Sequence, residues 1–208
     1  MVVMAERART YGGATGSERQ SRRRAALLDA ALDTIAADGV AAVTVRGVCL
    51  RARLNDRYFY ESFRTVDDLV LAVYDGQNAR AFAAMLPAIE SAPPDPVQRA
   101  RAAMSSGLDF LCADARRGQL LIEAQTTEGL RSRWRDLVKM LATVMAEQGR
   151  VLLAGQQPVD PDIDLAALTL VAGGFEVVTL WLRGELDVSR AHLEDFLVTM
   201  VTARQPAR

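Results

Sequence analysis

The sequence predicts an all-α protein in two parts, a small N-terminal unit of three helices and a larger helical body. Apolar residues recur at helical spacing from Arg22 to the end of the chain, and no strand-like alternation of useful length occurs. Half of the 208 residues are hydrophobic and a quarter are charged, so the chain carries enough apolar material for a real core. Two cysteines and one histidine provide neither a disulfide framework nor a cluster of metal ligands. We therefore expect no metal and no other cofactor.

The charges are unevenly distributed along the chain. The net charge is −1, but residues 1–64 hold 11 arginines and 7 acidic residues, a net charge of +4. A positively charged N-terminal part followed by a negatively charged remainder indicates that the N-terminal part approaches phosphates. Residues 1–20 are rich in Gly, Ser and Arg and lack apolar periodicity, so we expect a disordered arm there. Because these residues contain no apolar run of the signal-peptide type, we expect a cytoplasmic protein.

Residues 21–64 predict three helices. Ser21 is a candidate N-cap for the first helix, and Gly39 ends it. Thr44 is the candidate N-cap of a second, short helix, and Asn55 that of a third helix through Phe63. The first two helices carry apolar stripes formed by Leu27, Leu28, Ala31, Leu32 and Ile35, and by Val45, Val48, Cys49 and Ala52. Two helices of about eight residues joined by a tight turn describe a helix-turn-helix unit, so residues 21–64 are expected to form a DNA-binding domain.

Residues 65–204 predict the helical body, and the whole chain about nine helices. Thr65 and Asp68 give a capping-box-like start to the fourth helix, which reaches about residue 86. Asp95 and Pro96 begin the next helix after a proline-rich stretch, and a loop is expected at residues 155–158. The remaining helices are expected at about residues 96–114, 116–126, 130–153, 161–183 and from 189 onward.

The apolar run from Leu165 to Leu182 is long enough to be considered as a membrane-spanning helix. Thr169, Glu176 and Thr179 interrupt it, and no second run of this kind accompanies it. We expect a buried helix of a protein that does not span a membrane.

The third helix is suited to reading DNA. Leu54, Phe59 and Phe63 can pack inward, which leaves Arg57, Tyr58 and Tyr60 nearer to solvent. Alternatively, the two tyrosines only cover the core with their hydroxyls in water. Arg46 and Arg64 are candidate phosphate contacts, and Thr65 lies where a helix N-terminus could bind a phosphate oxygen.

At these positions the sequence resembles the TetR family of transcriptional regulators. The match rests on Thr44-Val45-Arg46-Gly47-Val48-Cys49, Arg51-Ala52, Leu54-Asn55-Asp56-Arg57-Tyr58-Phe59-Tyr60, and Phe63 with Leu69. The resemblance spans about residues 20–75 and implies a homodimer whose recognition helices enter major grooves of a palindromic operator about 34 Å apart. It also implies release of the double-stranded DNA by a small-molecule effector. The DNA-contacting residues that it implies are Thr44, Arg46, Asn55, Arg57, Tyr58, Tyr60 and Thr65, with Arg64 in place of a lysine usual at Val66.

The resemblance further implies a left-handed turn at Arg53, a position that the family usually fills with glycine. A residue with a Cβ is disfavoured there by about 1 kcal/mol.

The last two helices offer a face for a second copy of the chain. Two adjacent glycines in the middle of a helix cost about 1 kcal/mol each relative to alanine, and small residues allow helices to approach closely. The expected interface consists of Ala166, Leu170, Gly173, Gly174, Val177, Trp181, Leu193, Leu197 and Met200. The alternative is that these residues form a core within one chain.

The middle helices carry candidate residues for a small apolar or amphipathic effector. They are Met104, Phe110, Leu121, Gln125, Met140 and Glu176. Methionine at helical spacing is also typical of an ordinary core. Glu176 could orient a ligand, pair with a charge in a dimer, or face solvent.

Three functions remain open from the sequence. The first is a ligand-responsive repressor, the second an enzyme that uses the helical body, and the third a DNA-binding dimer without an effector. Catalysis requires a positioned base, nucleophile or metal, and His192 beside Glu194 and Asp195 is a poor candidate. We expect a regulator and no enzyme.

Overall fold

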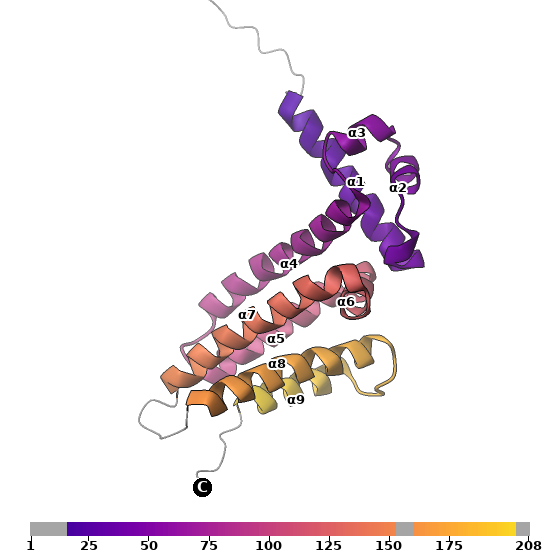
Figure 1. Ribbon diagram of the computed structural model, residues 1–208. Helices are drawn as coiled ribbons and strands as arrows, with labels where there is room; N and C mark the ends of the chain where they lie inside the picture. Colours follow the sequence, from indigo (N-terminus) through magenta and orange to yellow (C-terminus); the bar gives the residue numbers. More distant parts are fainter. Residues whose placement is uncertain (1–15, 153–159, 203–208) are drawn as a thin grey trace, which may run out of the picture.

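The computed structural model describes residues 16–152 and 160–202, and all regular structure in these ranges is helical (Figure 1). The predicted all-α class is therefore confirmed. The elements are α1 (Gly16–Asp38), the 3-10 turn η1 (Val40–Ala42), α2 (Val45–Ala52), α3 (Asp56–Tyr60), α4 (Val66–Ser91), α5 (Pro96–Cys112), α6 (Ala115–Thr126), α7 (Glu128–Leu152), α8 (Asp160–Leu182) and α9 (Arg190–Thr202). Helices α1–α3 lie at one end, and α4 leads from them into the body.

Three helix ends differ from the prediction. Helix α1 begins at Gly16 instead of Ser21, because the intervening residues contain no helix breaker and Glu18 suits the positive N-terminal end of the helix dipole. Residues 16–20 of the expected arm are thus helical, while residues 1–15 and the expected loop at 155–158 lie outside the described residues. Helix α3 ends at Tyr60, and α4 continues through Pro87 to Ser91.

The main hydrophobic core joins the N-terminal helices to the body. Leu27 and Ile35 of α1, Val48 of α2 and Phe59 of α3 are completely buried, and the start of α4 completes this cluster with Leu69. Leu120, Ala124 and Leu130 of α6 and α7 belong to the same cluster. Because the core is continuous across residues 64 and 65, packing marks no break there, and the predicted domain boundary stays a prediction.

Helix α8 is mostly uncovered, contrary to the expectation of a buried helix. Only 22% of its most apolar 18-residue window, within Pro161–Leu182, is buried inside the structure. One side packs on α7 through Ala167 and on α9 through Gly174, while Leu165 is 62% exposed on the other side. The composition shows that the helix is apolar, but neighbouring helices are too few to cover its whole circumference. A single helix of this length and composition is weak evidence for a membrane span.

Helix α6 is held to the N-terminal helices at both of its ends. Near its start, Arg116 pairs with Asp29 (3.0 Å) and Asp33 of α1. Near its end, the Glu123 carboxylate accepts a hydrogen bond from the Val40 N–H at 3.0 Å. On its other side, the Gln125 amide donates to the buried hydroxyl of Thr179 in α8. Helix α6 therefore connects α1 with α8 through polar contacts.

Candidate nucleic-acid interface

The predicted caps of α2, α3 and α4 form in the structure. The Thr44 hydroxyl accepts from the Gly47 N–H at 3.1 Å, and the Asn55 side chain accepts from the Tyr58 N–H at 3.4 Å. Thr65 and Asp68 exchange two hydrogen bonds and complete a capping box. The three cap side chains are exposed at one end of the molecule, so their first task is to set where α2, α3 and α4 begin.

The turn between α2 and α3 has the left-handed conformation that was predicted. Arg53 has φ 55° and ψ 41°, and among the described residues it is the one non-glycine with positive φ. The Leu54 N–H donates to the Cys49 carbonyl at 2.9 Å and closes the turn. Burial raises the pKa of the Cys49 thiol, and the Asp56 carboxylate raises it further. The thiol therefore stays protonated and serves as a small apolar group.

Helix α3 presents polar groups outward from one buried ring. Phe59 is completely buried, with its ring edge-on to Tyr60 at 5.3 Å between centroids and tilted against Phe63 at 5.8 Å. Tyr60 is nevertheless 62% exposed, whereas Tyr58 is half-buried. The alternative that both tyrosines only cover the core thus describes Tyr58 better than Tyr60. The side chain of Arg57 is 83% exposed.

The predicted phosphate-contacting arginines also face solvent. Arg46 lies in the first turn of α2, and Arg64 precedes the N-cap of α4. Both are exposed. The structure thus places all eight predicted DNA-contacting residues on α2, on α3, at the N-caps of these two helices and just before α4, within one part of the fold.

Two charged residues of this region were not among the site residues predicted from the sequence. Glu61, directly after α3, binds Arg57 at 3.2 Å and Arg23 of α1 at 3.3 Å. The guanidinium of Arg23 also stacks over the ring of Tyr58, 4.4 Å from its centroid. The spacing of four between Arg57 and Glu61 indicates a helical ion pair. No local pattern could reveal Arg23, which lies 38 positions away from Glu61.

The predicted effector-binding residues do not gather at one site. Gln125 and Glu176 line a groove of about 340 Å³ between α6, α7 and α8. Met140 lines a different groove, between α4 and α7. Met104 and Leu121 pack in the core between α5, α6, α8 and α9, and Phe110 is stacked by Arg117 at 4.0 Å. Helical periodicity placed these residues on apolar faces but could not distinguish the faces from one another.

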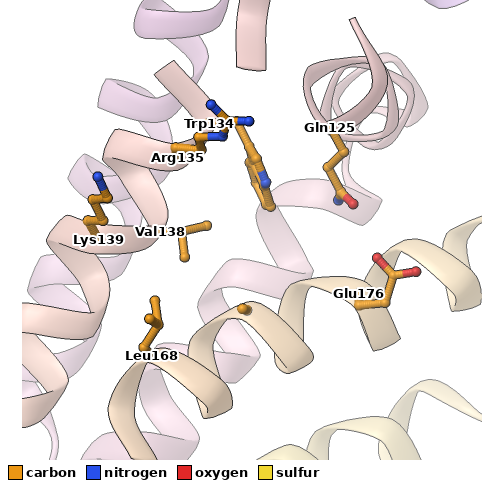
Figure 2. Close-up of a pocket in the computed structure, with 8 residues that line it drawn as sticks. Gln125, Trp134, Arg135, Val138, Lys139, Leu168 and Glu176 are labelled. Atoms are coloured by element: carbon orange, nitrogen blue, oxygen red, sulfur yellow. The ribbon is translucent and has the colours of Figure 1, made fainter. Parts of the chain in front are cut away.

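The groove between α6, α7 and α8 combines apolar and polar walls (Figure 2). Gln125 and Glu176 point toward one another at one end, and Val138 faces Leu168 at the other. Trp134 lies between these two ends. Its ring packs edge-on against Phe175, with 4.6 Å between the ring centroids. The lining residues that the sequence did not identify are Trp134, Arg135, Val138, Lys139, Leu168 and Ala172.

The predicted dimer residues divide into two groups. Leu193 and Leu197 are buried within the chain, Val177 and Trp181 pack against them, and the Trp181 indole N–H donates to the Val188 carbonyl at 3.0 Å. For these residues the alternative of an intrachain core describes the packing. Gly173 and Met200 are exposed, and Ala166, Leu170 and Gly174 are half-buried. The uncovered large apolar side chains nearby are Leu165, Leu168, Phe196 and Met200.

The acidic residues beside His192 are engaged in ion pairs. Arg101 of α5 binds Asp195 at 2.6 Å and Glu194 at 3.6 Å. The His192 backbone N–H donates to the Ser189 hydroxyl at 3.2 Å. These contacts fasten α9 to α5.

The comparisons with known proteins agree with this geometry. Residues 27–73 match the family model described as bacterial regulatory proteins, tetR family, which confirms the predicted resemblance. No match was found among curated proteins.

Several solved structures share the fold. A TetR-like transcriptional regulator from Rhodococcus sp. RHA1 is 20% identical, with a TM-score of 0.68 over 86% of this chain and 93% of that chain. The transcriptional regulator FadR from Bacillus subtilis, in complex with stearoyl-CoA, is 16% identical, with a TM-score of 0.69 over 87% and 99%. The fatty acid degradation regulator FadR from Bacillus halodurans is 17% identical, with a TM-score of 0.70 over 89% and 97%.

Proposed function

We propose that this chain, whose residues 27–73 match the tetR family, is a cytoplasmic transcriptional repressor that binds a palindromic operator as a homodimer. The observation that carries the proposal is the exposed face of α3. There Arg57 and Tyr60 stand outward from the buried Phe59, beside capped helix ends on a segment with net positive charge.

Each exposed group has a chemical role in this proposal. Arg57 can donate two hydrogen bonds to a guanine edge in the major groove. Arg46, Arg64 and Tyr60 can bind phosphate oxygens, which supplies affinity without reading sequence. The N-terminal end of α4, capped by Thr65, can bind a phosphate, because the backbone N–H groups of its first turn can donate hydrogen bonds to a phosphate oxygen.

The test is selection from a pool of random duplexes, followed by fluorescence anisotropy on the selected duplex and on a scrambled duplex. Arg57→Ala is expected to relax base preference at one position of each half-site, while Tyr60→Ala weakens binding to both duplexes alike. Arg99→Ala, an exposed arginine of α5, is the matched control. Affinity should fall steeply with salt, because phosphate contacts release counterions. Unchanged affinity in both α3 variants, or a flat salt dependence, would contradict the proposal.

The homodimer is proposed to form through the uncovered sides of α8 and α9. Helix α8 exposes Leu165 and Gly173, and its neighbour α9 exposes Phe196 and Met200, which are 47% and 45% exposed. A monomer rarely leaves several large apolar side chains exposed together on two neighbouring helices. A second copy is the occupant we propose, because a palindromic operator requires a twofold axis and a twofold interface uses the same face of both copies.

We further propose that a small amphipathic effector binds in the body and releases DNA. The groove between α6, α7 and α8 supports this, because Gln125 in its wall belongs to the helix that contacts α1 through Arg116 and Glu123. FadR from Bacillus subtilis, which shares the fold, was crystallised with stearoyl-CoA. A ligand that binds the free protein better than the DNA complex must lower DNA affinity.

Thermal shift tests the effector directly. Stearoyl-CoA is the first probe, followed by a library of smaller amphipathic compounds, and a true effector raises Tm and lowers the anisotropy of bound DNA. Glu176→Gln and Trp134→Ala should weaken the response without affecting DNA binding. If no compound changes Tm, the third function, a DNA-binding dimer without an effector, replaces this part of the proposal.

A further inference from the structure

We propose that Arg23 of α1 is a positioning residue for DNA recognition, which holds the side chains of α3 in the arrangement that reads bases. This inference rests on the proposed DNA binding and adds to it a residue outside the helix-turn-helix unit. Arg23 acts through two neighbours. It binds Glu61 at the end of α3 and covers the ring of Tyr58 within α3.

The contacts link α1 to the exposed side chain of Arg57 through Glu61. Arg23 Nη2 donates to Glu61 Oε2 at 3.3 Å, and Arg57 Nε donates to Glu61 Oε1 at 3.2 Å. Each carboxylate oxygen therefore receives one arginine. Arg57 uses only its Nε in the hydrogen bond to Glu61. Both of its terminal Nη groups therefore stay available for a base edge.

The charge balance of this group also requires Arg23. Glu61 is an acid on the surface that the proposal turns toward phosphates, and its side chain is 32% exposed. Paired with Arg57 alone, it would cancel the charge of the residue that reads bases. With Arg23 as the second partner, the three side chains together keep a net charge of +1.

A purely structural role would look different. Partly exposed ion pairs contribute little to folding stability, because water screens them and long side chains lose freedom. Arg23 and Glu61 are 26% and 32% exposed, and the large core beneath them is formed by other residues. The main effect of these contacts is to reduce the rotamers that Arg57 and Tyr58 populate before DNA arrives, which lowers the entropy lost on binding.

The experiment compares Arg23→Gln with Arg22→Gln on two duplexes, the one selected by the wild-type chain and a scrambled duplex of equal length. Both variants lose one positive charge from the same turn of α1, but within the described residues Arg22 is exposed and makes no hydrogen bond, ion pair or ring contact. Arg22→Gln should lower the affinity for both duplexes by the same factor, so that the ratio of the two affinities is unchanged. Arg23→Gln should lower this ratio about tenfold, because base contacts become disordered.

Three further measurements separate positioning from folding. Tm of Arg23→Gln should stay within about 2 °C of the wild type, as expected for a partly exposed ion pair. In a Glu61→Gln background, Arg23→Gln should lower the affinity ratio by a smaller factor, because one of its two targets is already removed. Arg23→Lys should recover part of the ratio, since an ammonium can pair with Glu61 but lacks the planar fork that stacks on Tyr58.

The outcomes distinguish this inference from the proposed function. If the wild-type chain enriches a sequence but Arg23→Gln retains the wild-type ratio, Arg23 is not a positioning residue while DNA binding stands. A large fall in Tm for both Arg23→Gln and Arg23→Lys would assign Arg23 a structural role and overturn the inference. If the wild-type chain enriches no sequence, the proposed function and the inference both fail.

Discussion

Replacing Gly173 with leucine tests the proposed dimer face most directly, because no other described helix packs against this glycine. Apart from the neighbouring backbone of α8, a Cβ built at Gly173 meets no atom of the described residues within 4 Å, whereas one at Gly174 lies 3.7 Å from Leu197 Cδ2 of α9. The two glycines are adjacent and look equivalent in the sequence. Of the two, only Gly173→Leu adds volume toward the proposed partner without disturbing the packing of α8 on α9.

Two opposing effects set the expected magnitude. Within one copy, leucine is the better helix former by about 1 kcal/mol, which raises Tm by about 2–4 °C for a chain of this length. In a packed interface an added side chain costs about 1–3 kcal/mol, and the twofold axis repeats it, for a total of about 2–6 kcal/mol. At about 1.4 kcal/mol per factor of ten, the dimer Kd should increase by about 30-fold to about 10⁴-fold.

Sedimentation equilibrium measures the dimer Kd, and thermal melts at high dilution report the effect within one copy. Gly76→Leu is the matched control, because Gly76 is also an exposed helical glycine, in α4. A Cβ built there meets no described atom within 4 Å outside the neighbouring backbone of its own helix. The control should raise Tm and leave the dimer intact. Operator affinity of Gly173→Leu should fall together with the dimer, since one half-site alone loses the second set of contacts. A Gly173→Leu variant that dimerises like the wild type would refute the placement of the interface on this side of α8.

Two further predictions concern stability. Arg53→Gly should raise Tm by about 1–3 °C in calorimetry. Relief of about 1–2 kcal/mol of left-handed strain is partly offset by the roughly 0.4–1 kcal/mol by which glycine stabilises the unfolded chain, and a fall in Tm would contradict this reasoning. The hydrogen bond from Arg116 holds the pKa of Asp114 below its ordinary value of 3.8, so the stability that this contact contributes is present above that pH and is lost as the pH falls through the lowered pKa. Asp114→Asn should therefore lower Tm at neutral pH and flatten the acid side of the Tm profile, and parallel profiles of variant and wild type would argue against this ion pair.

The helices and their caps followed from local signals. A cap is a bond between residues three positions apart, and a helical stripe repeats within four, so Thr44, Asn55 and Thr65 could be identified without knowing what they pack against. Helix ends depend on tertiary packing as well as on local signals. Helix α3 ends at Tyr60 although the apolar pattern continues to Phe63. A turn follows the helix at residues 61–62, and Phe63 is buried in the core directly after this turn, so burial continues the pattern where the helix does not.

The proposed DNA-contacting face could be located from the sequence, but its internal order could not. Exposure of Tyr60 and Arg57 follows from their positions on a helix whose other side carries Phe59. The contact of Arg23 with Glu61 depends on how α1 crosses α3, and residues 38 positions apart give no signal of it in one sequence.

The sequence by itself determined the helical class, the order of the helices, the capped helix-turn-helix unit and the cationic N-terminal part, because these depend on residue types and on bonds within one turn. Only the tertiary structure decided which apolar faces are covered. It buried Leu193 and Leu197, left Leu165 and Gly173 of α8 open, and distributed the predicted effector residues over separate sites. The physical reason is that burial stabilises in proportion to the apolar area that neighbouring segments remove from water. That area is a property of helix crossings between distant parts of the chain, which local periodicity does not encode.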